Sequence, residues 1–185
     1  TFGVERQDEL CGTAPVLQLE QVCCDDDKGL PALKAVSLQI CTREILGIAG
    51  VSGNGQKELA EVLCGVRTPT AGKILIGGKD VTGLSPLALD AAGLGRIPED
   101  RHMGVIDERS VVDNVAIEHI EEFSRRGIVD RQSVASYAQR LIQEFNIKAR
   151  PSDRTRTLSG GNLQKLILAR VLSRNPKAVI APQPT

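Results

Sequence analysis

Hydrophobic and polar residues alternate in two stretches near the start of the chain. Residues 16–22 (VLQLEQV) and 35–41 (AVSLQIC) place apolar side chains at every second position, which predicts strands with one face against a core. The acidic residues, glycine and proline of segment 25–31 (DDDKGLP) predict a turn between them. We expect these strands to form an antiparallel β edge, preceded by a tether over residues 1–15, which show no periodicity.

The rest of the chain is organised around an apolar run that is followed by three glycines. Residues 45–49 (ILGIA) are predicted to form a short buried strand, and the glycines follow within residues 50–55. Residues 56–64 then show the period of a helix, and Gly65 is a typical stop signal. A strand, a glycine loop and a helix in this order aim backbone N–H groups at phosphate.

Strands and helices alternate along the remaining sequence, which indicates an α/β fold. Strands are expected at 73–76, 93–97 and 178–181, and helices at 87–92, 110–120, 131–145 and 159–173. The apolar stripe of the 131–145 helix is interpreted as core and not as a cofactor site. We predict a core subdomain over residues 16–109, a helical subdomain over 110–174 and a last core strand within 175–185.

The spacing of the glycine loop fits a P-loop, but the two residues that follow it do not. Gly50 and Gly55 bracket the G-x-x-x-x-G motif, after which a P-loop has Lys and then Ser or Thr. This chain has Gln56 and Lys57, so Lys57 leaves the helix about 100° around from the position of a phosphate-binding lysine. The backbone amides remain available to phosphate, whereas the lysine charge and the hydroxyl that holds Mg²⁺ are lost. A dinucleotide fingerprint is disfavoured because Glu58 replaces its third glycine, and a plain strand-to-helix turn remains the alternative.

Composition excludes several classes of function. The 185 residues carry zero formal net charge and only 2% of them are aromatic, so neither charge nor base stacking supports nucleic-acid binding. The apolar runs are much shorter than a membrane span, and residues 1–15 do not resemble a secretory signal. Five cysteines without a C-x-x-C pair disfavour a disulfide scaffold or a zinc site and favour a reducing cytosol. By composition alone, the polar cluster at 98–102 is interpreted as a surface loop.

The segment Leu158-Ser159-Gly160-Gly161-Asn162 completes a set of motifs that resembles the nucleotide-binding domains of ATP-binding cassette (ABC) transporters. In that family a glycine loop on a strand, LSGG at a helix start and a buried strand occur in this order. The resemblance covers about residues 16–185, and LSGG distinguishes the family from GTPases and metabolic kinases. GVSGNGQKEL, PEDR, LSGGN and QPT are similar to the second half of tandem ATPase subunits that serve importers of simple sugars and nucleosides. The resemblance implies a P-loop NTPase-like ABC core with an antiparallel β edge and a helical signature subdomain, ending before the family's D-loop and switch histidine.

The family's phosphate-binding residues are only partly present in this sequence. The resemblance places the loop on Gly50, Ser52, Gly53, Asn54, Gly55, Gln56 and Lys57, with Gln56 in place of the phosphate lysine. Glu99 takes the position of the Q-loop glutamine. Pro182 and Gln183 take the positions of the Mg²⁺-binding Asp and the catalytic Glu. No catalytic residue is therefore expected to be intact in cis, and no metal site is expected on this chain.

The signature segment 158–162 is intact, apart from Asn162 in place of the usual Gln. Because the family's halves pair head to tail, the resemblance implies that this segment acts on the ATP of a partner half. ATP is then bound weakly in cis, Mg²⁺ is held only at the partner's site, and the isolated chain is inactive or nearly so.

The resemblance also implies partners and a location. The partners would be the first nucleotide-binding half of the same tandem subunit and membrane permease subunits, at the cytoplasmic face of the plasma membrane. A non-hydrolysing regulatory or scaffold module that docks on membrane subunits is the alternative. An independent P-loop kinase or GTPase lacks support because both the P-loop lysine and the acid after the last strand are missing.

Overall fold

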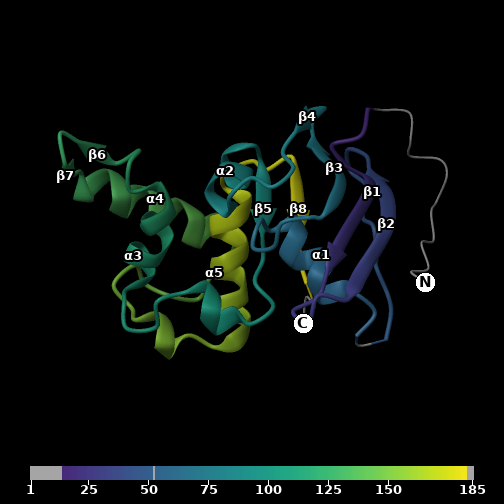
Figure 1. Ribbon diagram of the computed structural model, residues 1–185. Helices are drawn as coiled ribbons and strands as arrows, with labels where there is room; N and C mark the ends of the chain where they lie inside the picture. Colours follow the sequence, from purple (N-terminus) through teal and green to yellow (C-terminus); the bar gives the residue numbers. More distant parts are fainter. Residues whose placement is uncertain (1–13, 52, 183–185) are drawn as a thin grey trace. The chain divides into compact units, whose positions relative to one another are not determined.

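The computed structural model describes residues 14–51 and 53–182, and the chain divides into two compact units. Within the described residues, the first unit contains 14–96 and 176–180, and the second contains 97–175 with Ala181 and Pro182 (Figure 1). Segment 97–109 belongs to the second unit, although the predicted subdomain boundary comes after it. Most of the predicted tether, Ser52 and Gln183 lie outside the described residues.

A four-stranded antiparallel sheet forms one layer of the first unit. Its strands are β1 (Leu17–Asp25), β2 (Pro31–Ile40), β3 (Ala71–Ile76) and β4 (Lys79–Asp80), in the order β2-β1-β3-β4. Leu19 of β1 lies opposite Leu38 of β2 and Ile74 of β3. The antiparallel edge predicted from the alternating pattern is therefore confirmed, and both strands are longer than predicted.

A bulge at Gln21 shifts which positions of β1 face the core. The register of β1 with both neighbours shifts around this residue, whose φ of 50° is left-handed. β3 passes close to the bulge at Gly72, where an added Cβ would lie 2.4 Å from the Gln21 carbonyl oxygen. The buried side chains of β1 are at odd-numbered positions before the bulge, Leu17 and Leu19, and at even-numbered positions after it, Val22 and Cys24. Because the bulge adds one residue, all four still lie on the same face of the strand.

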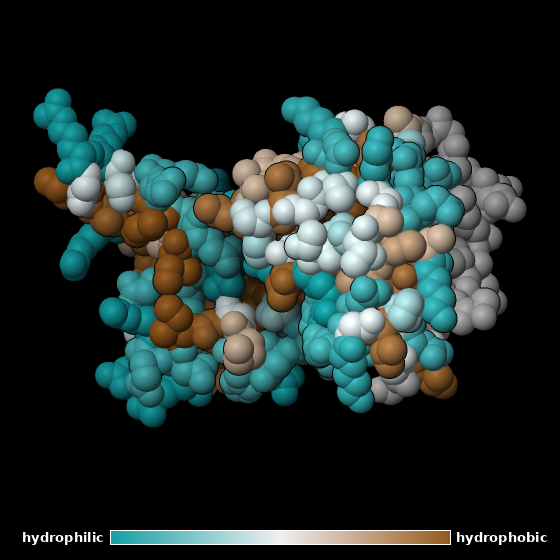
Figure 2. Space-filling model, in the orientation of Figure 1, coloured by the Kyte–Doolittle hydropathy of each residue, from teal (hydrophilic) through white to brown (hydrophobic). Residues whose placement is uncertain are grey.

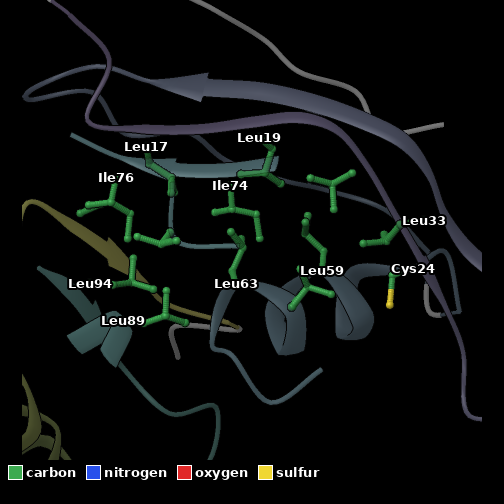
Figure 3. Packing of buried hydrophobic residues seen from close by; sticks show 14 residues of the cluster. Leu17, Leu19, Cys24, Leu33, Leu59, Leu63, Ile74, Ile76, Leu89 and Leu94 are labelled. Carbon is green, nitrogen blue, oxygen red and sulfur yellow. The ribbon is translucent and has the colours of Figure 1, made fainter. Parts of the chain in front are cut away.

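Two helices and a parallel strand pair complete the first unit. The helices are α1 (Gln56–Leu63) and α2 (Pro86–Ala91), and β5 (Leu94–Arg96) pairs in parallel with β8 (Ala178–Ile180). Figure 3 shows the core, in which leucines of α1 and α2 meet the apolar side chains of β1 and β3. The predictions of these helices and of the strand at 93–97 are confirmed.

The predicted strand at 45–49 is wrong. Residues 44–48 have no regular secondary structure, Ala49 alone forms a β-bridge, and the Ile45 side chain is 97% exposed. A buried strand needs hydrogen-bonding neighbours along its edges. The described strands β5 and β8 pair with each other, and no described strand lies beside residues 45–48. β8 was predicted as a buried strand, yet only Ala178 of its three residues is buried.

Three helices build the second unit. They are α3 (Val111–Ala116), α4 (Arg131–Glu144) and α5 (Gly160–Leu172), and short 3-10 turns and the hairpin of β6 (Ser124–Arg125) and β7 (Ile128–Val129) connect them. Each helix begins at a polar cap: the side chains of Ser110, Asp130 and Ser159 accept backbone N–H groups of the first turn. The stripe predicted on α4 packs into a core with α3 and α5, at Val111, Val115, Ala138, Leu141 and Leu166.

Hydrophobic side chains also reach the surface of the second unit. Figure 2 shows hydrophobic atoms over the region where Figure 1 labels α3, β6 and β7. Ile117 is 47% exposed, Ile120 39% and Ile128 76%. Among the described residues, no helix is both long enough and apolar enough to cross a bilayer.

Candidate functional site

The glycine loop leads directly into α1, whose first backbone amides have no partner within the helix. Gly53 and Gly55 have φ of 88° and 85°, and a Cβ added to Gly55 would lie 2.8 Å from the carbonyl oxygen of Ala32. A side chain would therefore displace the loop from β2. The first helical hydrogen bond runs from the Leu59 N–H to the Gly55 carbonyl at 2.9 Å. Earlier amides of α1 have no partner within the helix, so the loop retains the donors that a phosphate site uses.

Gln56 folds back over the start of the loop. Its Nε2 lies 3.5 Å from the Ile48 carbonyl oxygen and 3.2 Å from the position of a Cβ added to Gly50. A contact at 3.5 Å is at the weak limit of a hydrogen bond. The side chain at the lysine position is thus a neutral amide held weakly against the loop backbone.

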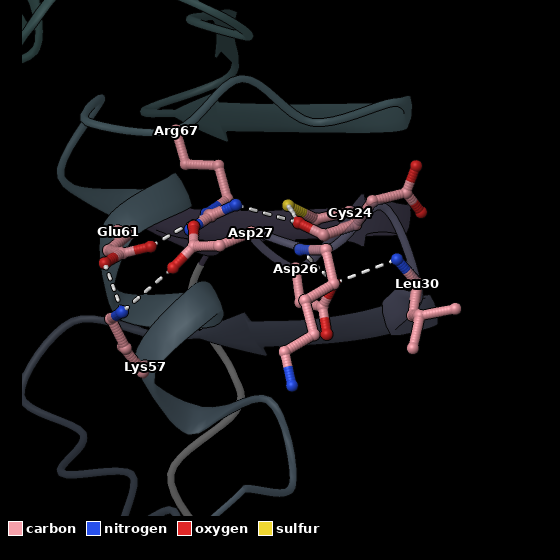
Figure 4. Close-up of polar contacts among 9 residues, drawn as sticks. Cys24, Asp26, Asp27, Leu30, Lys57, Glu61 and Arg67 are labelled. Atoms are coloured by element: carbon pink, nitrogen blue, oxygen red, sulfur yellow. Dashed lines mark hydrogen bonds and ion pairs between the residues drawn. The ribbon is translucent and has the colours of Figure 1, made fainter.

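Lys57 points away from the loop into a network of charged side chains (Figure 4). Its Nζ lies 3.4 Å from Asp27 Oδ2 and 3.6 Å from Glu61 Oε1. Arg67 joins the same two carboxylates, with a hydrogen bond to Asp27 and a 2.8 Å contact to Glu61 Oε2. It also donates to the Asp25 carbonyl at 3.0 Å. The network ties the turn after β1 to α1, and the Lys57 charge is engaged there.

The charges of this network shift each other's pKa values. The hydrogen bond from Arg67, followed by the charges of Arg67 and Lys57, lowers the pKa of Asp27. The charge of Asp27, and then that of Glu61, raises the pKa of Lys57. A carboxyl with a lowered folded-state pKa stabilises the fold above its ordinary value of 3.8, and this stabilisation is lost as pH falls through the lower value.

Asp27→Asn is expected to lower the stability of the chain at pH 7 and to make its stability less dependent on pH below about pH 4. An asparagine side chain does not titrate, so the pH-dependent part of the stability that Asp27 contributes disappears in this variant. Urea unfolding at pH 7 and at pH 3 measures both effects, with Glu20→Gln as the control for an exposed carboxylate. An unchanged pH dependence in Asp27→Asn would contradict the coupling of Asp27 to Arg67.

The signature segment forms the beginning of α5. Ser159 is the N-cap, and the first intrahelical bond runs from the Leu163 N–H to the Ser159 carbonyl at 2.9 Å. The N–H groups of Gly160 and Gly161 therefore have no partner in the helix. A Cβ added to Gly161 would meet nothing within 4 Å among the described atoms. The prediction of a helix that starts at Ser159 is confirmed.

The hydroxyl of Ser159 is free to donate a hydrogen bond. Its Oγ accepts the Asn162 N–H at 3.4 Å and Asn162 Nδ2 at 2.9 Å, which occupy its acceptor positions. Asn162 Oδ1 accepts the Lys148 N–H at 2.9 Å, so the Asn162 side chain is fixed in this orientation. Ser159 can thus present its proton at the positive end of a 13-residue helix, beside two amides that have no partner within that helix.

The structure locates some of the other predicted site residues. Glu99 is exposed in the second unit, just before the 3-10 helix η2 (Arg101–Gly104). Pro182 lies in a bend after β8, whereas Ser52 and Gln183 are outside the described residues. The roles assigned to these positions remain predictions. Within the described part of the chain, no cluster of His, Cys, Asp and Glu could hold a metal ion.

Sequence analysis missed the partner of Lys57. The acidic residues of segment 25–31 were predicted only to form a turn, yet Asp27 lies against Lys57 and Arg67. The two cations and Glu61 come from segments 30 to 40 residues further along the chain. The helical spacing of Lys57 and Glu61 was the one local signal, because residues four apart share a helix face.

Comparison with known proteins decides the family. Residues 33–185 match the family model described as ABC transporter. The chain belongs to the ABC transporter family. The resemblance expected from the glycine loop and the LSGG segment is thereby confirmed.

Curated relatives are ATP-binding proteins of importers. The glucose import ATP-binding protein of Haloferax volcanii is 42% identical over 190 residues, covering 100% of this chain and 34% of that protein. The guanosine import ATP-binding protein of Bacillus subtilis is 36% identical over 177 residues, covering 93% of this chain and 34% of that protein. A ribose import ATP-binding protein of Mesorhizobium japonicum is 40% identical over 152 residues, covering 81% and 30%. The chain spans about a third of the length of these relatives.

Solved structures confirm the α/β ABC fold. A nucleotide-free ATP-binding cassette from an ABC transporter superposes with a TM-score of 0.76 at 20% identity, covering 93% of this chain and 70% of that chain. The ADP conformation of another ATP-binding cassette gives 0.74 at 21% identity, covering 90% and 68%. At this identity the likeness concerns the fold alone.

Proposed function

We propose that this chain is a nucleotide-binding half of an ATPase that drives import of simple sugars or nucleosides. Its own phosphate loop is degenerate, and its signature segment completes the ATP site of a partner half. The import activities named for the curated relatives support the substrate class. The partner is the first half of the same tandem subunit, and permease subunits receive the assembly at the cytoplasmic face of the membrane.

The contrast between the two helix N-termini carries this proposal. At α1 the cation nearest the loop is engaged by Asp27 and Glu61, and Gln56 contributes only a neutral amide. At α5 the Ser159 hydroxyl and two amides are free to donate. The N-terminus of α1 thus lacks the charge that binds a triphosphate, whereas that of α5 keeps a hydroxyl and two amides that can donate to an anion.

The exposed apolar residues of the second unit support docking on permease subunits. Ile117, Ile120 and Ile128 present hydrophobic side chains to solvent on a unit with a complete core of its own. Apolar side chains that gather on a surface often mark a protein–protein interaction site, and a permease subunit would cover them.

This chain lacks the carboxylates that would hold Mg²⁺ beside its own glycine loop. The last strand is followed by Pro182 and Gln183, where the family has its two acids. The chain by itself therefore hydrolyses ATP no faster than background, and the metal is held by the partner half.

ATP turnover by the assembled ATPase tests the proposal. Gly161→Asp must inactivate the assembly, and Gln56→Ala must leave most of its activity. The engagement of Lys57 by Asp27 favours a second candidate, a scaffold module that binds no nucleotide and contributes nothing to turnover. For the scaffold module, both variants would turn over ATP as the unaltered assembly does.

Gln56→Lys combined with Lys57→Ser is expected to tighten ATP binding to the isolated chain about 10- to 100-fold. The double variant restores a cation and a hydroxyl at the positions a P-loop uses, and a charged hydrogen bond contributes about 1.5–3 kcal/mol. Calorimetric titration with ATP measures the change, and Lys57→Ser alone is the control. Equal affinity of the double variant and the unaltered chain would mean that the loop is not shaped to bind phosphate.

A further inference from the structure

The imidazole of His119 is buried in the second unit, with a polar partner at each ring nitrogen. His119 ends the 3-10 helix η3 (Ile117–His119), and its side chain is 6% exposed. Its Nδ1 lies 3.0 Å from Glu122 Oε1, and its Nε2 lies 3.2 Å from the hydroxyl of Tyr137 on α4. The ring thus lies between a carboxylate and a phenol, and the proposed function uses neither the ring nor these partners.

The contacts of His119 belong to a longer row of hydrogen bonds. The Tyr137 hydroxyl lies 2.8 Å from Ser173 Oγ, and Ser173 Oγ lies 3.0 Å from the Arg170 carbonyl oxygen. Four contacts therefore run in a row from the Glu122 carboxylate to this carbonyl. This row, which we call the His119 network, joins the turn that follows α3 to α4 and to the end of α5.

A neutral His119 cannot complete the network. Both of its ends only accept, because an ionised carboxylate and a backbone carbonyl have no hydrogen to donate. Between the ends, Tyr137 and Ser173 each have one hydroxyl hydrogen, and a neutral imidazole has one N–H. Three hydrogens must then serve four contacts, and the contact without a hydrogen brings two acceptor atoms together. An imidazolium has the missing fourth hydrogen.

The charges around the network are compatible with one additional proton on the ring. Charged groups flank it on each element: Asp113 on α3, Glu118 and Glu121 near the ring, Asp130 and Arg140 on α4, and Arg170 and Arg174 at the end of α5. Glu118 is engaged by Arg170 at 2.9 Å, and Arg140 lies over the Tyr137 ring. Glu122 is the carboxylate in contact with the ring, and an imidazole binds a proton more strongly than a carboxylate does.

We propose that His119 is a proton-binding site that holds the turn at residues 117–123 against α4 and α5. When the proton leaves to water, one of the four contacts loses its hydrogen and the network opens at that contact. The site involves neither the glycine loop nor the signature segment, so it is independent of the proposed function. The same turn carries Ile117 and Ile120, and the proton therefore controls how two exposed apolar side chains are held.

The sign of the pH dependence follows from where the proton is held. The imidazole of an unfolded chain loses its proton near pH 6.5, whereas the folded network retains it. The stability that the network contributes is therefore fully present below about pH 6.5 and is lost as pH rises. One proton corresponds to a change of at most about tenfold in the unfolding equilibrium constant per pH unit.

Urea unfolding of the whole chain between pH 6.5 and 8 tests the proposal. The unfolding equilibrium constant of the unaltered chain should rise with pH more steeply than that of His119→Gln, by up to about tenfold per unit. Ser173→Ala should be as flat as His119→Gln, because a neutral ring and the Tyr137 hydroxyl have enough hydrogens for the two contacts that remain. Ser152→Ala removes an exposed serine outside the network and should keep the steep dependence. His102, the other histidine, is present in every variant, so its contribution cancels.

Two results of the unfolding experiment would overturn the inference. Equal pH dependence of the unaltered chain and His119→Gln would mean that the network binds no additional proton. A steep dependence that persists in Ser173→Ala would mean that the proton serves only the pair with Glu122.

Nitrogen-15 NMR of the imidazole provides a second measurement that does not require His119→Gln to fold. At pH 7 we expect hydrogens on both ring nitrogens of His119 in the unaltered chain, and on one of them in Ser173→Ala. The same number of hydrogens in both proteins would also overturn the inference.

Discussion

Gly161→Asp is expected to reduce ATP turnover by the assembled ATPase at least about 100-fold, because a carboxylate would occupy the place of the partner's phosphate. Removing one donor from an anion-stabilising site costs about 100- to 1,000-fold in rate, and a fixed negative charge adds repulsion. The substitution has room, since a Cβ at Gly161 meets nothing within 4 Å among the described atoms. A carboxylate in the first turn also stabilises a helix. The fold should therefore become no less stable while the activity disappears.

Gly161→Asn is the matched control for this prediction. It has nearly the same shape as Asp but no charge, so it separates repulsion of phosphate from crowding. We expect Gly161→Asn to retain substantially more turnover than Gly161→Asp, and Gln56→Ala to cost only a few-fold. Turnover that survives Gly161→Asp but is lost in Gln56→Ala would reverse the roles assigned to the two helix N-termini.

Arg170→Ala is expected to lower the free energy of unfolding of the chain by about 2–4 kcal/mol. Arg170 is 8% exposed and joins three parts of the second unit. Its guanidinium contacts Glu118 Oε1 at 2.9 Å, the Gly104 carbonyl at 2.6 Å and the Asn114 carbonyl at 3.4 Å. Removing it takes the nearer cation from Glu118, takes this donor from the two carbonyls and leaves a cavity beside α5. Urea unfolding at neutral pH measures the loss.

Arg174→Ala is the control for Arg170→Ala. Arg174 lies just after the end of α5, and its side chain is 30% exposed. It lies 3.8 Å from the same Glu118, so its removal is expected to cost less than about 1 kcal/mol. Arg170→Lys should remain well below the unaltered chain, because one ammonium cannot span the three acceptors. Equal stability of Arg170→Ala and Arg174→Ala would mean that the buried network contributes nothing.

The strands and helices that the sequence predicts correctly depend on local patterns. Alternation predicts β1 and β2, and polar caps predict the starts of α3, α4 and α5. The period of the 131–145 segment identifies the buried face of α4, since 3.6 residues per turn bring its apolar residues together. The segment 45–49 has the composition of a buried strand and does not form one, because a strand depends on neighbours that are distant in sequence.

The sequence by itself determined the family and the order of most helices and strands. It also determined the direction in which Lys57 leaves α1, because helix geometry relates neighbouring residues in a known way. It also determined that Ser159 caps α5, since a cap is formed within three residues. Only the tertiary structure decided that Asp27 engages Lys57 and that Arg101 lies against Gly160. These pairs are 30 and about 60 residues apart. The contact between Arg101 and Gly160 forms where Gly104 packs on Ile167 of α5. No spacing rule within one helix or strand predicts such a contact, because it joins segments that are distant in sequence.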